Sequence, residues 1–140
     1  MNINSLDRFI EAQEKMYPVA LKELKAGKKR SHWMWYIFPQ LRGLGMSSMA
    51  HTYGISGLDE AKAYLEHPVL SERIYELCGA LLEHKDKTAY EIFGDIDEMK
   101  LRSSMTLFAL TNEDYTIFDE VLDCFFEGKM DEATLELINR

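Results

Sequence analysis

The residues best suited to chemistry lie in one basic, aromatic segment of the chain. It reads Arg30-Ser31-His32-Trp33-Met34-Trp35-Tyr36-Ile37-Phe38-Pro39-Gln40 and directly follows Lys28 and Lys29. Lysine and arginine side chains bind anions, and histidine can bind an anion or transfer a proton near neutral pH. Tryptophan offers a flat face on which a planar group can stack. The segment therefore predicts a site for a small anionic molecule, a class that includes nucleotide-like ligands.

The candidate ligand-binding residues of this segment are two cations, a hydroxyl, an imidazole, a ring and an amide: Lys29, Arg30, Ser31, His32, Trp35 and Gln40. Lys29 and Arg30 would hold the anionic group, and Ser31 with the start of a helix would add short donors. Trp35 would stack on a planar moiety, and His32 would provide any proton transfer. The pattern specifies no reaction, so enzyme activity is neither predicted nor excluded.

A structural interpretation of the same segment stands beside the functional one. Read as a short helix capped by Ser31 and ended by Pro39, it carries apolar side chains on every side. Such a helix runs through a core, which favours buried tryptophans over a ligand platform. A histidine in these surroundings is more often a hydrogen-bonded core residue. The basic residues could likewise form a solvated loop.

A second segment, Lys100-Leu101-Arg102-Ser103-Ser104-Met105-Thr106, also combines cations and hydroxyls. Helical spacing gathers Lys100, Ser103 and Ser104 on one arc and sends Arg102 elsewhere, where we expect it to pair with a carboxylate. The serines could instead reflect close helix packing or hydroxyls bonded to their own helix. We predict that Lys100, Ser103 and Ser104 share one pocket with the tryptophan segment.

Charge is strongly segregated along the chain. The protein has 16 basic and 24 acidic residues and a net charge of −8, yet no Asp or Glu occurs between Leu24 and Leu58. A basic segment on an acidic body favours a small anionic molecule or an acidic protein surface as partner, and disfavours extended nucleic acid. Binding of a small anion and docking to an acidic protein partner are therefore the two functional hypotheses.

The sequence contains no pattern typical of a metal site, a cofactor site, a signal peptide or a membrane span. Cys78 and Cys124 lack the spacing of zinc ligands, so we expect buried free thiols, no metal and a reducing compartment. No known cofactor motif is present, and none is predicted. The chain shows no signal peptide and no apolar run long enough for a membrane span. We therefore expect a cytoplasmic protein without a membrane partner.

The apolar residues recur at three- and four-residue steps and predict an all-α fold. We expect one domain over residues 1–140, a multihelical bundle of about seven or eight helices. Besides the helix over residues 31–39, the predicted ranges are Ser5–Ala26, Asp59–Glu66, Ser71–His84, Ile96–Leu110, Asp114–Phe126 and Asp131–Ile138. Asn4 or Ser5 would cap the first helix, Pro18 would kink it and Gly27 would end it. Asp95 with Glu98 would form a capping box for the fourth range.

Both segments resemble a known family. Arg30-Ser31-His32-Trp33-Met34-Trp35, Ile37-Phe38-Pro39-Gln40-Leu41 and Lys100-Leu101-Arg102-Ser103-Ser104-Met105-Thr106-Leu107-Phe108 are similar to the bacterial domain-of-unknown-function 1810 family. The resemblance extends over almost the whole chain, including Glu91-Ile92-Phe93-Gly94. It implies a mostly α-helical fold and a bacterial intracellular origin. It brings no established biochemical activity.

Overall fold

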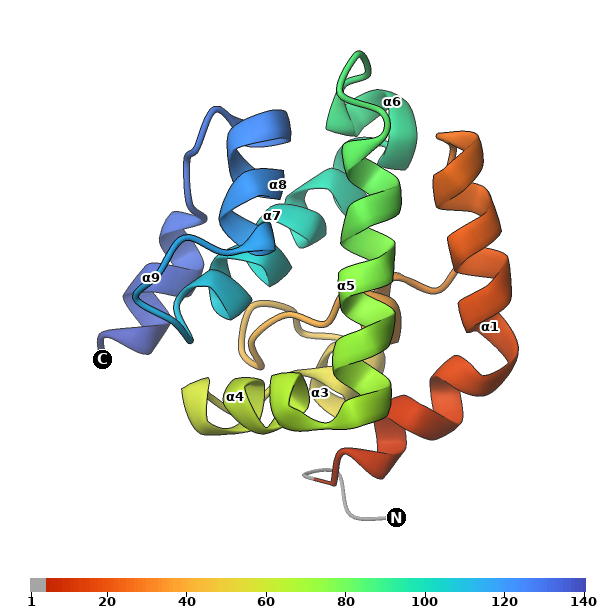
Figure 1. Cartoon of the computed structure of the whole chain (residues 1–140). Coiled ribbons are helices and arrows are strands. Elements are labelled where there is room, and N and C mark those ends of the chain that lie inside the picture. The colour runs from red at the N-terminus through yellow and green to blue at the C-terminus, as the bar shows by residue number, and fades with distance from the viewer. Residues whose placement is uncertain (1–4) are drawn as a thin grey trace.

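The computed structural model describes residues 5–140, and this part of the chain contains nine helices. They are α1 (Asp7–Ala26), α2 (Met34–Ile37), α3 (Ser48–Tyr53), α4 (Leu58–Glu66), α5 (Pro68–Leu82), α6 (Ala89–Phe93), α7 (Asp95–Ala109), α8 (Ile117–Phe126) and α9 (Glu132–Ile138). No strand occurs in these residues, so the all-α prediction is confirmed. Figure 1 shows α5 between α1 on one side and α7 and α8 on the other.

The long predicted helices are present, whereas the short elements differ from the prediction. The two short helices α3 and α6 were not among the predicted ranges. The expected helix from Ser31 to Pro39 is reduced to one turn, and its N-cap is Trp33 rather than Ser31. The Ser31 hydroxyl is drawn away because it donates to Glu23.

Helix capping follows local hydrogen bonds that the sequence pattern only partly indicates. Gly94, not Asp95, is the N-cap of α7, so the capping box predicted for Asp95 and Glu98 is wrong. Thr88 forms such a box with Glu91 at the start of α6. The N-cap of α1 is Leu6 and not Ser5 as predicted, although the Ser5 hydroxyl accepts from the amide of Asp7. The alternative cap for α1, Asn4, lies outside the described residues.

Helix α1 carries both expected interruptions. Pro18 lies inside it without ending it, and Figure 1 shows the ribbon bending partway along its length, as a missing amide donor and ring crowding require. Gly27 ends the helix in the left-handed conformation, with φ of 79°, which a glycine adopts without steric penalty. The chain then turns directly into the basic segment.

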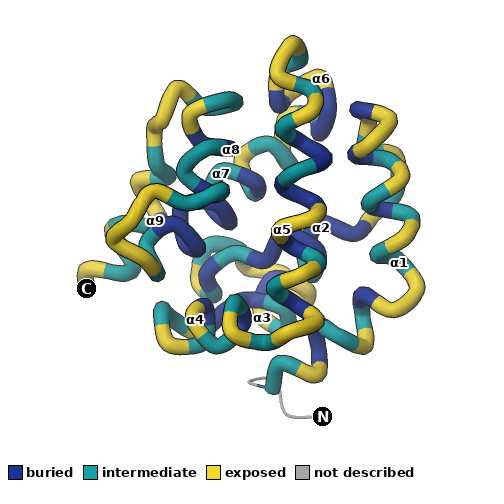
Figure 2. Tube along the Cα trace, viewed as in Figure 1, coloured by how far each residue is buried: buried dark blue, intermediate teal, exposed yellow. Residues whose placement is uncertain are grey.

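The buried apolar side chains form one continuous cluster that involves α1, α2, α4, α5, α6, α7 and α8. In Figure 2 the second half of α7, from Leu101 onward, is largely buried, whereas its first half lies at the surface and α1 and α4 alternate between buried and exposed positions. Helix α7 packs against four other helices, α4, α6, α8 and α9, and is therefore the central element among them. Cys78 is a buried free thiol as expected, but Cys124 is only partly buried.

Main-chain hydrogen bonds hold the tryptophan segment at both of its ends. The backbone around Leu41 pairs with Ile55 in a single parallel bridge, with hydrogen bonds of 2.9 Å from the Ile55 amide to the Gln40 carbonyl and 2.7 Å from the Arg42 amide to the Ile55 carbonyl. On the other side, the amide of Lys29 donates to the carbonyl of Ile92 at 2.8 Å. The segment is thus held at both ends by main-chain bonds, which fixes where its side chains point.

Candidate functional site

Two adjoining cavities lie where the tryptophan segment meets α7. The larger has a volume of about 240 Å³ and the smaller about 90 Å³, and both are lined by Trp35 and Lys100. We call the pair the Trp35–Lys100 cleft. The smaller cavity is further lined by Lys29, His32, Trp33, Met34 and Asp97. The larger is further lined by Gln40, Leu44, Gly45, Ile96, Met99, Ser103, Asp131 and Ala133.

Two lysines share one carboxylate in this cleft. The ammonium of Lys29 lies 2.8 Å from one carboxylate oxygen of Asp97, and that of Lys100 lies 3.7 Å from the other. Lys29 also donates to the carbonyl of Ser31 at 2.5 Å and lies 4.8 Å from the ring centroid of Trp33. Lys29 is therefore fully engaged by the protein, whereas the ion pair of Lys100 with Asp97 is long.

Of the two lysines in the cleft, Lys100 has the less completely paired ammonium group and is the one that could contact a bound anion. Its ammonium lies 3.5 Å from the ring centroid of Trp35, and its side chain is largely buried. Burial lowers the pKa of Lys100, as does the positive charge of Lys29, and the carboxylate of Asp97 offsets this only in part. A desolvated, incompletely paired ammonium is a group that an anion would stabilise.

The carboxylate of Glu23, in the last turn of α1, holds the start of the basic segment through hydrogen bonds. Its carboxylate accepts hydrogen bonds from the Ser31 hydroxyl at 2.6 Å, from the amides of Arg30 and Ser31 at 2.8 and 3.0 Å, and from the Trp33 indole at 2.9 Å. Burial raises the pKa of Glu23, but these four donors outweigh it and lower the pKa to about 2. The carboxylate is thus a fixed structural anion under the segment.

Of the nine residues predicted from sequence to bind a ligand, six line the cleft: Lys29, His32, Trp35, Gln40, Lys100 and Ser103. The other three, Arg30, Ser31 and Ser104, line neither cavity. The Arg30 side chain is exposed, and Ser31 is committed to Glu23. The two segments therefore meet as predicted, but around Lys100 and Trp35.

Ser104 is a separate case. It is fully buried, and its hydroxyl has no hydrogen-bond partner among the described residues. Its neighbour Ser103 donates to the carbonyl of Met99 one turn earlier, at 3.1 Å. Ser104 thus fits the close-packing interpretation, and Ser103 fits the interpretation of a hydroxyl bonded to its own helix while still reaching the cleft.

The two tryptophans and His32 divide between core and surface. Trp33 is completely buried and packs against Phe38 and Phe93, which confirms the core interpretation for this residue. Trp35 is only partly buried. His32 is exposed at the edge of the smaller cavity, so the interpretation of His32 as a core residue is wrong. It is wrong because the helix begins after His32 and leaves its side chain outside the packed turn.

Arg102 does not pair with a carboxylate, contrary to the prediction. Its guanidinium donates to the carbonyls of Lys129 and Met130, both at 2.9 Å, in the link between α8 and α9. Next to it, the Thr106 hydroxyl accepts from the amide of Asp131 at 2.9 Å. These bonds hold the start of α9 against α7, where Asp131 and Ala133 complete the wall of the larger cavity.

Three features were not predicted from the sequence: Glu23, Asp97 and the apolar side chains that line the larger cavity. Asp97 precedes Lys100 by three residues, a spacing that places both on one helix face and was a usable signal. Glu23 is the last acidic residue before the acid-free stretch, but only the turn at Gly27 folds it beneath that stretch. Of the apolar lining, Met99 and Ile96 lie one turn before Ser103 and Lys100 on α7 and were predictable from helical spacing.

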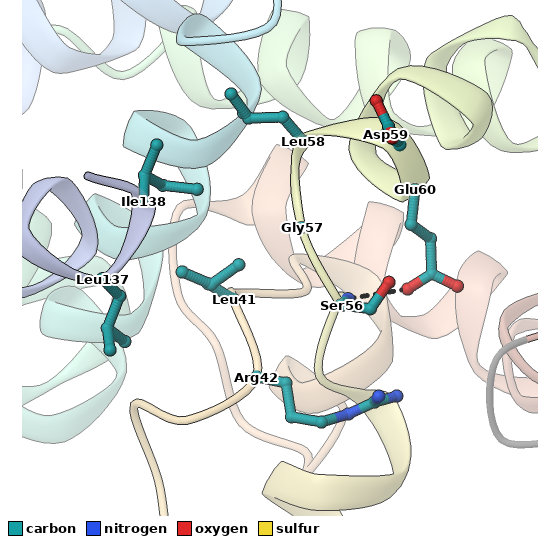
Figure 3. A pocket seen from close by; sticks show the side chains of 9 residues that line it. All are labelled: Leu41, Arg42, Ser56, Gly57, Leu58, Asp59, Glu60, Leu137 and Ile138. Atoms are coloured by element: carbon teal, nitrogen blue, oxygen red, sulfur yellow. Dashed lines mark hydrogen bonds between the residues drawn. The ribbon is translucent and has the colours of Figure 1, made fainter. Parts of the chain in front are cut away.

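A larger cavity of about 480 Å³ lies elsewhere, between the start of α4 and the end of α9. Figure 3 shows the apolar side chains of Leu41, Leu58 and Ile138 around it. Of its charged groups, Glu60 accepts from the amide of Ser56 and forms a buried ion pair with Arg8 at 3.0 Å, and Arg42 donates to the carbonyl of His51. This cavity holds none of the predicted site residues and offers a weaker case for binding an anion.

Residues 5–140 show neither a metal site nor a membrane-spanning helix. No group of three or more His, Cys, Asp or Glu side chains there is arranged to hold a metal ion. Over the same range, no helix combines the length and apolar character that crossing a membrane requires.

Comparison with known proteins places the chain in a family. The family model described as "Protein of unknown function (DUF1810)" matches residues 3–138. Among solved structures, the chain is similar to the conserved hypothetical protein Rv1873 from Mycobacterium tuberculosis, with 44% sequence identity, a TM-score of 0.95 and coverage of 99% of both chains. No curated protein matches the chain. The resemblance seen in the sequence is confirmed: the chain belongs to the DUF1810 family of proteins of unknown function.

Proposed function

We propose that the Trp35–Lys100 cleft binds a small anionic molecule. The observation that carries the proposal is the unequal pairing of charges at its centre. Among the described residues, Lys29 and Lys100 form ion pairs only with Asp97, so Lys100 has no close counter-ion of its own, while the second carboxylate of the cleft, Asp131, accepts two hydrogen bonds from Thr134. A charge that is partly shielded from water attracts an anion more strongly than one on the open surface.

The form of the cleft supports the same proposal. Small-molecule sites are concave and mostly apolar, with a few polar groups that orient the ligand. The larger cavity has this character, because Leu44, Ile96 and Met99 supply apolar wall while Gln40 and Ser103 supply an amide and a hydroxyl. A titratable group with a shifted pKa in such a cleft, here Lys100, is a further mark of a functional site.

The proposal is for binding, and no reaction is assigned. The hydroxyl of Ser103 donates its proton to the Met99 carbonyl, so it is not held by a base that would activate it as a nucleophile. His32 lies at the edge of the smaller cavity and could transfer a proton to or from a bound molecule. The geometry around it does not identify a bond that would be made or broken.

Docking of an acidic protein partner is the second candidate, and one observation favours it. Met46, Ile96 and Met99 are large apolar residues that are 99%, 70% and 66% exposed, and Ile96 and Met99 line the larger cavity. An apolar surface around a cation is typical of the centre of a protein interface as well as of a ligand site. Binding of small anions by the isolated protein decides between the two.

The chain offers a direct way to test this. It contains two tryptophans, so a ¹⁵N NMR spectrum carries two indole N–H signals. We expect titration with acetate, inorganic phosphate, benzoate and adenosine monophosphate to move the Trp35 signal with saturation for at least one of them. The Trp33 indole, which is bound to Glu23 in the core, serves as the internal control. If none of these anions moves the Trp35 signal, the proposed function is wrong and docking gains support.

A further inference from the structure

The shape of the Trp35–Lys100 cleft narrows the class of its ligand. Lys100 and Trp35 line both cavities, so they lie where the two cavities meet. The positive charge of Lys100 is at this junction, and the apolar side chains line the larger cavity on one side of it. We infer that the ligand is a small monoanion with a flat apolar body, of the aromatic carboxylate class. This inference rests on the proposed function and adds the chemical class of the ligand. The carboxylate would contact Lys100, and the rings would occupy the larger cavity.

The volume of the larger cavity sets the size of the apolar body. A closed apolar cavity of about 150 Å³ holds one benzene ring, and sites for drug-sized ligands begin at roughly 300 Å³. A volume of about 240 Å³ therefore fits one or two fused rings. The smaller cavity, at about 90 Å³, has room for a carboxylate but for no ring system in addition.

The lining of the larger cavity matches a flat apolar body. The Trp35 ring and the Met99 thioether are groups that pack well against aromatic faces and edges. Gly45 widens the space, since a Cβ at this position would lie 3.9 Å from both the Trp35 ring and the Gln40 amide, and only 2.8 Å from the Cβ of Ala50. The close approach of the loop to α3 thus requires glycine and leaves the mouth of the cavity open.

The charges around the cleft favour a monoanion over a polyphosphate. The two lysines of the cleft, Lys29 and Lys100, are balanced by two carboxylates, because Asp131 lines the larger cavity in addition to Asp97 in the smaller one. The molecule as a whole carries −8. A ligand with three or four negative charges would meet two carboxylates and two lysines, of which Lys29 is already paired closely with Asp97, so its additional charges would be repelled.

The test distinguishes the contribution of the ligand's negative charge to the affinity from the contribution of its apolar rings. Four probes are titrated into the full chain and followed by the Trp35 indole signal: acetate, 2-naphthoate, its neutral amide 2-naphthamide, and adenosine triphosphate. We expect 2-naphthoate to bind about tenfold or more tightly than each of the other three, because it alone combines one negative charge with two fused rings. The Trp33 indole signal again reports any general perturbation.

A variant blocks the body of the ligand without touching the cations. Ala133 is exposed on α9 and lines the larger cavity but not the smaller one, so Ala133→Phe would fill the space for the rings. We expect it to weaken 2-naphthoate about tenfold and leave acetate unchanged. Glu136→Phe, an exposed site on the same helix that lines neither cavity, is the matched control and should bind 2-naphthoate like the wild type.

Each other outcome contradicts a specific step. If acetate or adenosine triphosphate binds as tightly as 2-naphthoate, the aromatic carboxylate inference is wrong while the proposed anion function stands. If 2-naphthamide binds as tightly as 2-naphthoate, the anion function itself is wrong. If no probe moves the Trp35 signal, both are wrong. If Ala133→Phe binds 2-naphthoate like the wild type, the rings do not occupy the larger cavity, and the inference fails on geometry.

Discussion

The ammonium group of Lys100 lies 3.5 Å from the centroid of the Trp35 ring. This contact joins α7 to the one-turn helix α2 and places a positive charge on an aromatic face at the junction of two cavities. The nearby carboxylate of Asp97 is shared with Lys29, so Lys100 is held by the ring as much as by an ion pair.

The first prediction concerns the pH dependence of binding. The pKa of Lys100 is lowered mainly by burial, and a bound anion would raise it. Binding of 2-naphthoate should therefore be full below the pKa of Lys100 in the free protein and weaken as the pH rises through it, at a pH below the ordinary lysine value of 10.5. The other titratable groups that line the cleft with Lys100 are Lys29, His32, Asp97 and Asp131. Dissociation constants measured between pH 7 and 11 test this.

Lys100→Arg is the control for this pH prediction. The guanidinium keeps its charge throughout this pH range, so the variant should not show the alkaline loss of affinity. If Lys100→Arg loses affinity over the same pH range as the wild type, another group is responsible for the titration.

The second prediction concerns the core. Trp33→Ala should lower the free energy of unfolding by about 3 to 5 kcal/mol, the usual range for emptying a buried large aromatic site. Trp33 is fully buried and contacts Phe38 and Phe93, whereas Trp35 is partly exposed. Trp35→Ala should therefore cost clearly less in the same urea titration. Equal losses for the two variants, or no loss for Trp33→Ala, would contradict this division of the tryptophans.

The third prediction concerns Glu23. Glu23→Gln should lower the free energy of unfolding at pH 7 by about 1 to 3 kcal/mol, since an amide cannot accept from all four donors and its own N–H groups would face them. Glu11→Gln, an exposed site on the same helix, is the matched control and should be close to neutral.

The pH dependence of that difference has a definite sign. The pKa of Glu23 falls from 4.5 to about 2 in the folded state, so its ionised form stabilises the fold above pH 4.5. This stabilisation is lost as the pH falls from about 4.5 towards 2. The wild type and Glu23→Gln should therefore differ by a constant amount between pH 5 and 7 and converge below that. A difference that persists unchanged at pH 2.5 would show that the carboxylate is not held as described.

The sequence was informative wherever a helical pattern acts locally. The long helices, the bend in α1 and its end at Gly27 follow from apolar spacing, proline and glycine chemistry. The same spacing put Lys100 and Ser103 on one face of α7, and both line the cleft. The meeting of the tryptophan segment with α7 was predictable because each carries polar groups on an otherwise apolar surface that must be buried.

The sequence was less informative wherever long-range contacts override a local preference. Ser31 is a good helix cap in isolation, but Glu23 of the preceding helix takes its hydroxyl and shortens α2. His32 is then left outside the turn and exposed. Arg102 finds two carbonyls in a distant link where a carboxylate was expected. None of these partners is close enough along the chain to be found from helical periodicity.

The most direct measurement is the affinity for 2-naphthoate of three proteins by isothermal titration calorimetry: the wild type, Lys100→Met and Lys22→Met. Lys22 is an exposed lysine of α1 that lines neither cavity of the cleft, so its variant removes the same charge from elsewhere. The account predicts equal dissociation constants for the wild type and Lys22→Met, and a constant about tenfold or more weaker for Lys100→Met, the loss expected for one charge-assisted contact. Equal binding by Lys100→Met and Lys22→Met would contradict the claim that Lys100 anchors an anion in this cleft.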